Sequence, residues 1–186
     1  MKLQLVQRSS EKKSETKRLR REGFIPAILY VNGKPCEAFA LKQADFAALM
    51  RQVKPGRLAT MILTLELEKG KARKAIIKEI QYDVTSYTPI HIDFEELQEN
   101  VKVNVNVPIE FVGVDDCVGV KLGGVLRQVI RNLKVRCLPK DIPACLQLDV
   151  SKLEMRQSKR LSALELPKSV KPCADLNEVA VVIAGR

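Results

Sequence analysis

The feature that most constrains the fold is a series of short segments in which apolar and polar residues alternate. This period of two is typical of half-buried β-strands, because successive side chains point to opposite faces of a sheet. Segments with this pattern, or with a short apolar run of strand length, are 1–8, 25–31, 36–42, 60–67, 72–82, 90–94, 101–112, 125–138 and 179–184. The 125–138 segment is expected to be interrupted near Arg131. We therefore predict a mainly β protein with a few short helices (α+β).

Turn and helix signals lie between these segments. Asn32-Gly33 suits a type I′ turn, because both residues accept positive φ. Apolar residues at helical spacing over 46–53 predict a helix that ends before Pro55-Gly56. The polar segment 10–22, followed by Gly23 at a helix-terminating position, predicts a short exposed helix or an ordered loop.

An acidic and polar stretch at 95–100 marks a domain boundary. The segments before it predict a small β-barrel with one or two helices, and those after it a β-rich domain with irregular connections. We therefore expect an N-terminal β-barrel domain over 1–95 and a β-rich C-terminal domain over 96–186.

The charge of the chain favours a polyanionic partner. Lys and Arg outnumber Asp and Glu by 32 to 22, giving a net charge of +10. The excess is local: residues 1–21 hold eight basic and two acidic side chains, whereas residues 96–186 hold 14 and 11. Such a patch is typical of nucleic-acid binding. Charge alone equally allows a merely basic soluble protein.

Cysteine usage argues against a metal site. The five cysteines are widely spaced, no CxxC pair occurs and His91 is the only histidine, so we expect no structural zinc and no cofactor. Free thiols suit a reducing compartment. The N-terminus lacks the apolar stretch of a signal peptide, and no apolar run approaches the ~20 residues that span a bilayer. We expect a cytoplasmic protein without a membrane partner.

The cluster Lys17-Arg18-Leu19-Arg20-Arg21 places cations around most of a helical turn, with no acidic stripe at i,i+4 to neutralise it. Guanidinium groups match phosphate oxygens and guanine edges. A solvated charged face is the other interpretation of such a run. The Gly123-Gly124 pair has neither of the spacings of a nucleotide-binding loop and predicts a turn.

Three further residues are candidates for specific contacts. Composition favours a core position for Tyr30, although an exposed ring could stack on a base. His91 and Asp93 fall on one face of a strand, because side chains alternate there. Catalysis would need a nucleophile or metal that no motif supplies, so we favour a pair presented to RNA or a structural pair. We expect no enzyme and no small-molecule substrate.

Several of these segments resemble a known family when taken in order. The matching stretches are Lys17 to Gly23, Ile25-Pro26-Ala27-Ile28-Leu29-Tyr30, Ile77-Lys78-Glu79-Ile80-Gln81 and His91-Ile92-Asp93-Phe94. They resemble the bacterial 5S-rRNA-binding ribosomal protein family "L twenty-five". Segments such as Val107-Pro108-Ile109, 119–124, 137–143 and Asn177-Glu178-Val179 resemble its longer two-domain members, called general stress protein CTC.

The resemblance implies an N-terminal barrel like the anticodon-binding barrels of glutaminyl-tRNA synthetase. It also implies binding to the loop E region of 5S rRNA in the central protuberance of the large ribosomal subunit, beside neighbouring ribosomal proteins. Positions matching the family's RNA contacts are Arg8, Lys13, Thr16, Lys17, Arg20, Tyr30, Lys78, Gln81, His91 and Asp93. Arg18 and Arg21 join this set because of their charge. Tyr82 stands where the family usually has a basic residue, which removes a phosphate contact or substitutes stacking.

Two other functions stay open. The chain could be a stress-related protein-interaction factor whose domain after Asn100 binds a protein partner, because the charge of that half is diffuse. An enzyme centred on His91 and Asp93 is the weakest hypothesis.

Overall fold

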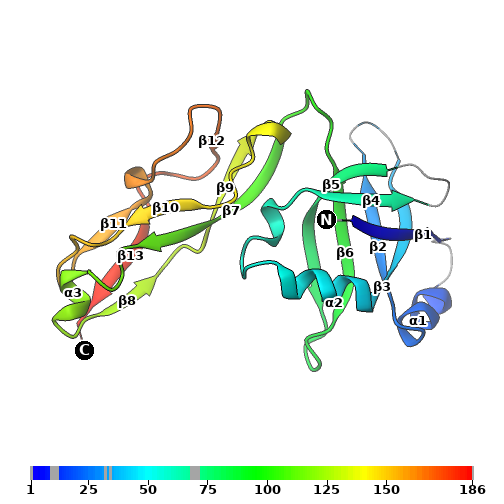
Figure 1. Cartoon of the computed structure of the whole chain (residues 1–186), viewed down its shortest axis with the longest axis horizontal. Helices are drawn as coiled ribbons and strands as arrows, with labels where there is room; N and C mark the ends of the chain where they lie inside the picture. Colours follow the sequence, from blue (N-terminus) through cyan, green and yellow to red (C-terminus); the bar gives the residue numbers. More distant parts are fainter. Residues whose placement is uncertain (1, 9–12, 32, 34, 68–71, 186) are drawn as a thin grey trace. The chain divides into compact units, whose positions relative to one another are not determined.

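A computed structural model describes residues 2–8, 13–31, 33, 35–67 and 72–185. Contacts within the chain divide it into two units, Met1–Gln98 (unit 1) and Glu99–Arg186 (unit 2) (Figure 1). Both units consist mainly of β-strands with short helices, which confirms the predicted fold class. Across the described residues, no helix is long and apolar enough to cross a membrane.

Unit 1 is a closed β-barrel, as predicted, with the strand order β1-β3-β2-β6-β5-β4. Its strands are β1 (Lys2–Gln7), β2 (Phe24–Tyr30), β3 (Glu37–Lys42), β4 (Leu63–Leu67), β5 (Ala72–Tyr82) and β6 (Pro89–Glu96). Two parallel pairings, β1 with β4 and β2 with β6, join strands that are distant in sequence and close the barrel. The predicted strands therefore assemble through contacts that no local turn signal specifies.

The alternating pattern places one face of each strand inside the barrel. Leu3 and Leu5 of β1, Leu29 of β2, and Ile92 and Phe94 of β6 are at most 2% exposed. Helix α2 (Gln43–Gln52) adds two further buried side chains to this core, Phe46 and Leu49. A single 3₁₀ turn, η1 (Leu58–Thr60), leads from α2 to β4. The outer face of β6 therefore carries polar residues such as His91 and Asp93.

The basic segment forms a helix, α1 (Lys13–Arg21). Of the two structures that the sequence allowed for this segment, a short helix or an ordered loop, the helix is therefore the one observed. Gly23 follows it with φ +78°, a conformation that favours glycine, and its N–H donates to the Arg20 carbonyl at 3.3 Å. Gly33 has φ +76°, as a type I′ turn requires, whereas Asn32 lies outside the described residues.

Unit 2 contains two small sheets. The first has the order β10-β7-β9-β12 and the second β11-β13-β8. The strands are β7 (Val103–Val112), β8 (Val125–Gln128), β9 (Asn132–Cys137), β10 (Leu146–Asp149), β11 (Ser158–Arg160), β12 (Lys171–Pro172) and β13 (Val179–Ala184). The helical turns are α3 (Val118–Lys121), η2 (Pro139–Asp141) and η3 (Leu161–Ala163). The gap between β8 and β9 confirms the interruption predicted near Arg131.

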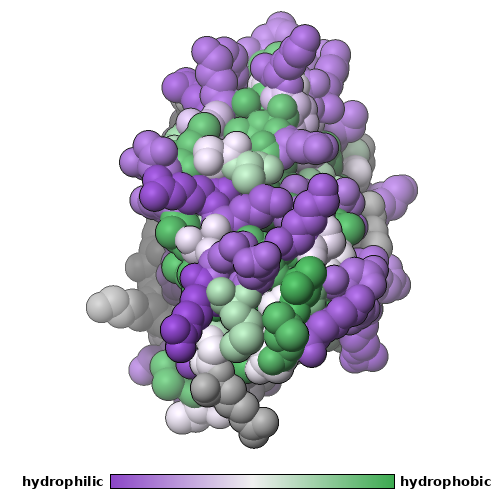
Figure 2. Space-filling view, turned by 90° about the vertical axis from the view of Figure 1, so that its left-hand side faces the viewer, coloured by the Kyte–Doolittle hydropathy of each residue, from purple (hydrophilic) through white to green (hydrophobic). Residues whose placement is uncertain are grey.

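The Gly123-Gly124 pair of unit 2 forms the turn that the sequence predicts. Gly124 N–H donates to the Gly119 carbonyl at 2.9 Å. A Cβ atom on Gly124 would lie 2.6 Å from that oxygen and 2.7 Å from Ile183 Cγ2, so glycine is needed for this close approach. Figure 2 shows one face of unit 2, where hydrophobic groups are interspersed among hydrophilic ones.

Candidate nucleic-acid interface

The outer face of β6 brings together candidate residues from separate parts of the sequence. Because Ile92 and Phe94 point into the core, His91 and Asp93 point outward. The antiparallel register with β5 sets Gln81 opposite His91, and the parallel register with β2 sets Ile28 opposite Asp93. The chain thus presents a polar strip across β5 and β6 that contains Gln81, His91 and Asp93, whereas β2 contributes apolar Ile28 beside it and Tyr30 at its end.

Asp93 holds the centre of this strip. The Tyr30 hydroxyl donates to Asp93 Oδ2 at 2.9 Å, across 63 residues of sequence. His91 Nδ1 lies 2.7 Å from Asp93 Oδ1, and neither of these two enclosed atoms has a partner at hydrogen-bond geometry within the described part of the chain. A carboxylate oxygen at this distance favours the imidazole tautomer with its proton on Nδ1, which leaves Nε2 for a ligand. Tyr30, Asp93 and His91 therefore form one oriented unit.

The placement of Tyr30 corrects the core position that composition favoured. Its side chain is 36% exposed and lies on the outer face of the barrel. The hydrogen bond to Asp93, followed by desolvation, raises the pKa of Tyr30 above its usual value of 10.0. The hydroxyl is therefore protonated at neutral pH and is a donor.

Lys78 and Gln81 lie on β5 beside this unit. Lys78 follows a register shift between Ile77 and Glu79, and its Nζ lies 2.5 Å from Glu95 Oε2. A phosphate at Lys78 would have to compete with that carboxylate. Gln81 is exposed, so its amide is available to a ligand.

Helix α1 is fastened next to the strip. Arg20 Nε donates to the Ile90 carbonyl at 3.2 Å, one residue before His91. The side chains of Lys17, Arg18, Arg20 and Arg21 are exposed and Thr16 is half-buried. Lys13 opens the helix, but its side chain lies outside the described atoms. The helix therefore places four cationic side chains at one edge of the strip.

One sequence expectation about this helix was wrong. Arg18 Nε lies 3.5 Å from Glu22 Oε1, an acidic partner at i,i+4. Both side chains are more than half exposed, and exposed pairs of this kind contribute only about 0.3–0.5 kcal/mol. The pair offsets part of one charge and leaves most of the helix charge in place.

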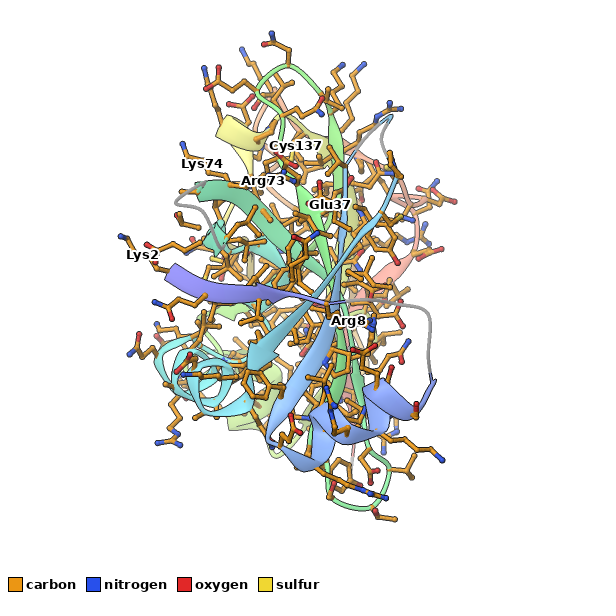
Figure 3. All side chains as sticks on the ribbon, turned by 90° about the vertical axis from the view of Figure 1, so that its right-hand side faces the viewer. Lys2, Arg8, Glu37, Arg73, Lys74 and Cys137 are labelled. Atoms are coloured by element: carbon orange, nitrogen blue, oxygen red, sulfur yellow. The ribbon has the colours of Figure 1, made fainter. Side chains whose placement is uncertain are left out.

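Some basic side chains elsewhere on the barrel have close acidic partners. Arg73 Nη1 lies 2.9 Å from Glu37 Oε1, and Figure 3 shows the two side chains together. Lys2 Nζ lies 2.8 Å from Glu66 Oε1. By contrast, Lys17 and Arg21 form no ion pair with the described residues. Among the described residues, Lys17 and Arg21 thus add unpaired positive charge on α1, as exposed Lys42, Arg51, Lys54 and Lys74 do elsewhere in unit 1.

Arg8 directly follows β1 and is the last residue described before Lys13. Its Nε donates to the Phe39 carbonyl at 2.9 Å, so the guanidinium is oriented by the neighbouring strand (Figure 3). The other guanidinium N–H groups can still contact a phosphate.

The loop between β5 and β6 has an internal order that sequence reasoning did not single out. Asp83 Oδ1 accepts from the backbone N–H groups of Thr85 and Ser86 and from the Thr85 hydroxyl, at 2.9, 3.0 and 2.6 Å. These donors lower the pKa of Asp83 to about 2. The signal was an Asp followed by Thr and Ser two and three residues later, which is typical of an Asx turn.

Comparison with known proteins covers the whole chain. Residues 3–94 match the Ribosomal L25p family, and residues 102–186 match the Ribosomal protein TL5, C-terminal domain. Large ribosomal subunit protein bL25 of Chlamydia muridarum (strain MoPn / Nigg) is 45% identical over 186 residues, which is all of both chains. The proteins of the same name from Chlamydia caviae and Chlamydia pneumoniae are 43% and 40% identical over the same length.

Proposed function

The chain belongs to the ribosomal L25p family, in its two-domain bL25 form, and from this premise we propose that unit 1 binds the loop E region of 5S rRNA in the central protuberance. Membership makes the protein a non-enzymatic structural constituent of the large ribosomal subunit. The geometry of unit 1 supports binding of 5S rRNA by particular residues.

The observation that carries the proposal is the oriented unit of Tyr30, Asp93 and His91 beside the cationic helix α1. A-form RNA displays base edges and 2′-hydroxyls in a wide, shallow minor groove that a flat protein face can reach. The strip on β5 and β6 offers hydrogen-bonding groups for those edges. The cations of α1 offer contacts for the flanking phosphates.

Asp93 then has two tasks. Its Oδ1 is enclosed next to His91 Nδ1 and holds the proton-bearing side of the ring by charge, so direct contact with RNA falls to Oδ2 and to the Tyr30 oxygen. A carboxylate repels phosphate, and we therefore assign it a donor of the RNA, such as a guanine amine or a 2′-hydroxyl.

The phosphate contacts are assigned to the side chains outside the strip. Arg8, Lys13, Thr16, Lys17, Arg18, Arg20, Arg21 and Lys78 are the candidates. Neutralising phosphates releases counterions, so the affinity should fall steeply with salt. Gln81, His91 and the Tyr30–Asp93 pair should carry the sequence preference instead.

The test compares a 5S rRNA loop E fragment with a scrambled duplex of equal length, at one fixed salt concentration. We expect the full chain to prefer loop E, and Tyr30→Ala or His91→Ala to remove most of that preference. Lys17→Gln removes one of the proposed phosphate contacts. Lys74→Gln is its matched control, because exposed Lys74 lies eight residues before the end of β5 at Tyr82, about 26 Å along the strand. Equal binding to both RNAs by wild type would refute the proposal and favour a protein partner of unit 2.

A further inference from the structure

The loop of residues 83–88, between β5 and β6, carries the most exposed large apolar side chains of the described chain. Val84 is 88% exposed and Tyr87 is 79% exposed. Folding leaves these two side chains almost entirely in water. An aromatic ring in that position gains most when a ligand covers it.

The loop holds these side chains in a fixed arrangement. Asp83 N–H donates to the Thr88 carbonyl at 2.8 Å, and Tyr87 N–H donates to the Asp83 carbonyl at 3.0 Å. The hydroxyls of Ser86 and Thr88 lie 2.7 Å apart. Tyr87 itself has φ +52°, which a bulky residue rarely adopts. The ring of Tyr87 therefore projects from an ordered loop.

The loop is continuous with the proposed RNA interface. It begins after Tyr82, next to the Gln81–His91 pair, and ends before Pro89, where β6 begins. The hydrogen bond from Arg20 to the Ile90 carbonyl fastens α1 to the first residues of β6. Figures 1 and 3 both show α1 and this loop at the same end of the barrel. An RNA that lies on the strip and on α1 has the loop at its border.

The distribution of aromatic residues distinguishes RNA from a protein partner. All three tyrosines of the chain, Tyr30, Tyr82 and Tyr87, are at least 36% exposed and lie in β2, β5 and the loop. Three of the five phenylalanines are at most 4% exposed in the barrel core. Tyr87 is flanked by hydroxyl groups and by a carboxylate that already has three donors, rather than by the apolar surface around a protein hot spot. A single projecting ring of this kind suits an unstacked base.

We propose that the 83–88 loop is a further RNA contact, in which the ring of Tyr87 stacks on an unpaired base next to the segment bound by the β5–β6 strip. The inference rests on the proposed function, because the strip and α1 bring the RNA to the loop. Asp83 acts as a positioning residue that orders the loop and does not touch the RNA.

The experiment measures binding of the full chain to intact 5S rRNA and to the scrambled duplex, for wild type, Tyr87→Ala, Tyr87→Phe and Val84→Ala. Tyr87→Ala should weaken binding to 5S rRNA about 5- to 150-fold, the range that follows when one stacked base loses its aromatic partner. Tyr87→Phe should bind within twofold of wild type, and Val84→Ala is the control for loss of apolar area on the same loop. The salt dependence of Tyr87→Ala should equal that of wild type, because no phosphate contact is lost.

The outcomes separate the two proposals. If wild type prefers 5S rRNA and Tyr87→Ala binds it equally well, the loop contact is refuted and the function of unit 1 stands. If Tyr87→Phe is as weak as Tyr87→Ala, the hydroxyl rather than stacking is responsible, and the proposal is also refuted. If wild type shows no preference for 5S rRNA, the proposed function fails first. Thermal unfolding of each variant checks for a folding defect. Because Tyr87 is largely exposed, the Tm of its variants should equal that of wild type.

Discussion

The hydroxyl of Tyr30 gives the most informative single perturbation of the interface. Tyr30→Phe removes the donor to Asp93 Oδ2 and keeps the ring. A hydrogen bond in a folded protein contributes about 0.5–1.5 kcal/mol net, and up to about 3 kcal/mol when one partner is charged. Because Tyr30 is 36% exposed, solvent screens the pair in the free protein, and we expect a loss of about 0.5–1 kcal/mol there.

The same bond should contribute more in the complex, where RNA covers the pair and excludes water. A loss of about 1.5–3 kcal/mol is expected in that state. The difference between bound and free protein, about 1–2 kcal/mol, corresponds to roughly a 5- to 30-fold rise in Kd. In the free protein, a domain of this size should lose roughly 2–8 °C in Tm.

Two assays on one preparation separate these effects. Fluorescence anisotropy with a labelled loop E fragment gives Kd at fixed salt, and circular dichroism gives Tm. Tyr82→Phe is the matched hydroxyl deletion, since the Tyr82 hydroxyl forms no hydrogen bond with the described residues, and its Tm should equal that of wild type. A Tyr30→Phe protein with the expected fall in Tm but a Kd within twofold of wild type would refute the role of the pair in binding.

The pH dependence of protein stability independently tests the contribution of the Tyr30 hydroxyl. Its pKa is raised in the folded state, so the stability from its hydrogen bond is complete below pH 10.0 and is lost as the pH rises through the raised pKa. As the pH rises through this range, the free energy of unfolding of wild type should therefore approach that of Tyr30→Phe. If the stability difference between the two proteins were constant through this range, the hydroxyl would not be the source.

Two further predictions concern charge and unit 2. Arg21→Gln should make the plot of log K against log salt concentration less steep by about 0.7–0.9. Arg18→Gln should reduce the steepness by less, because Glu22 already offsets part of its charge, and Lys74→Gln should leave it unchanged. An equal effect of all three variants would contradict local phosphate contacts. Gly124→Ala should destabilise unit 2 by roughly 1–3 kcal/mol in calorimetry, because backbone must shift around the added Cβ, while loop E binding stays within twofold of wild type. Loss of RNA binding in that folded variant would refute the assignment of binding to unit 1.

Local pattern was sufficient for most strands because a half-buried strand carries its own period of two. Strand β5 and strand β13 have the predicted bounds, 72–82 and 179–184. The sequence predicted a barrel but not which strands pair to close it, because the parallel pairing of β1 with β4 joins residues about 60 positions apart. Nothing in either strand alone encodes that partner.

The candidate site shows the same division between local and long-range information. His91 and Asp93 alternate with buried Ile92 and Phe94, so their common face was predictable. Tyr30 ends a run in which almost every residue is apolar, and this run hides the period of two that would have placed the ring outside. The bond from Arg20 to the Ile90 carbonyl depends on tertiary structure, because a backbone acceptor 70 residues away leaves no mark on the sequence.

Carboxylates on the barrel face constrain how RNA can lie on it. Glu79 and Asp93 are register partners on β5 and β6, and Glu95 follows on the same side of β6. Phosphates would be repelled there, whereas α1 attracts them, so the groove edge with ribose hydroxyls should face the strip and the backbone should face α1. A DNA duplex of the loop E sequence keeps its phosphates but lacks the 2′-hydroxyl donors. We expect it to bind more weakly than the RNA with a similar salt slope; equal affinity would place phosphates, not hydroxyl donors, at the centre of the interface.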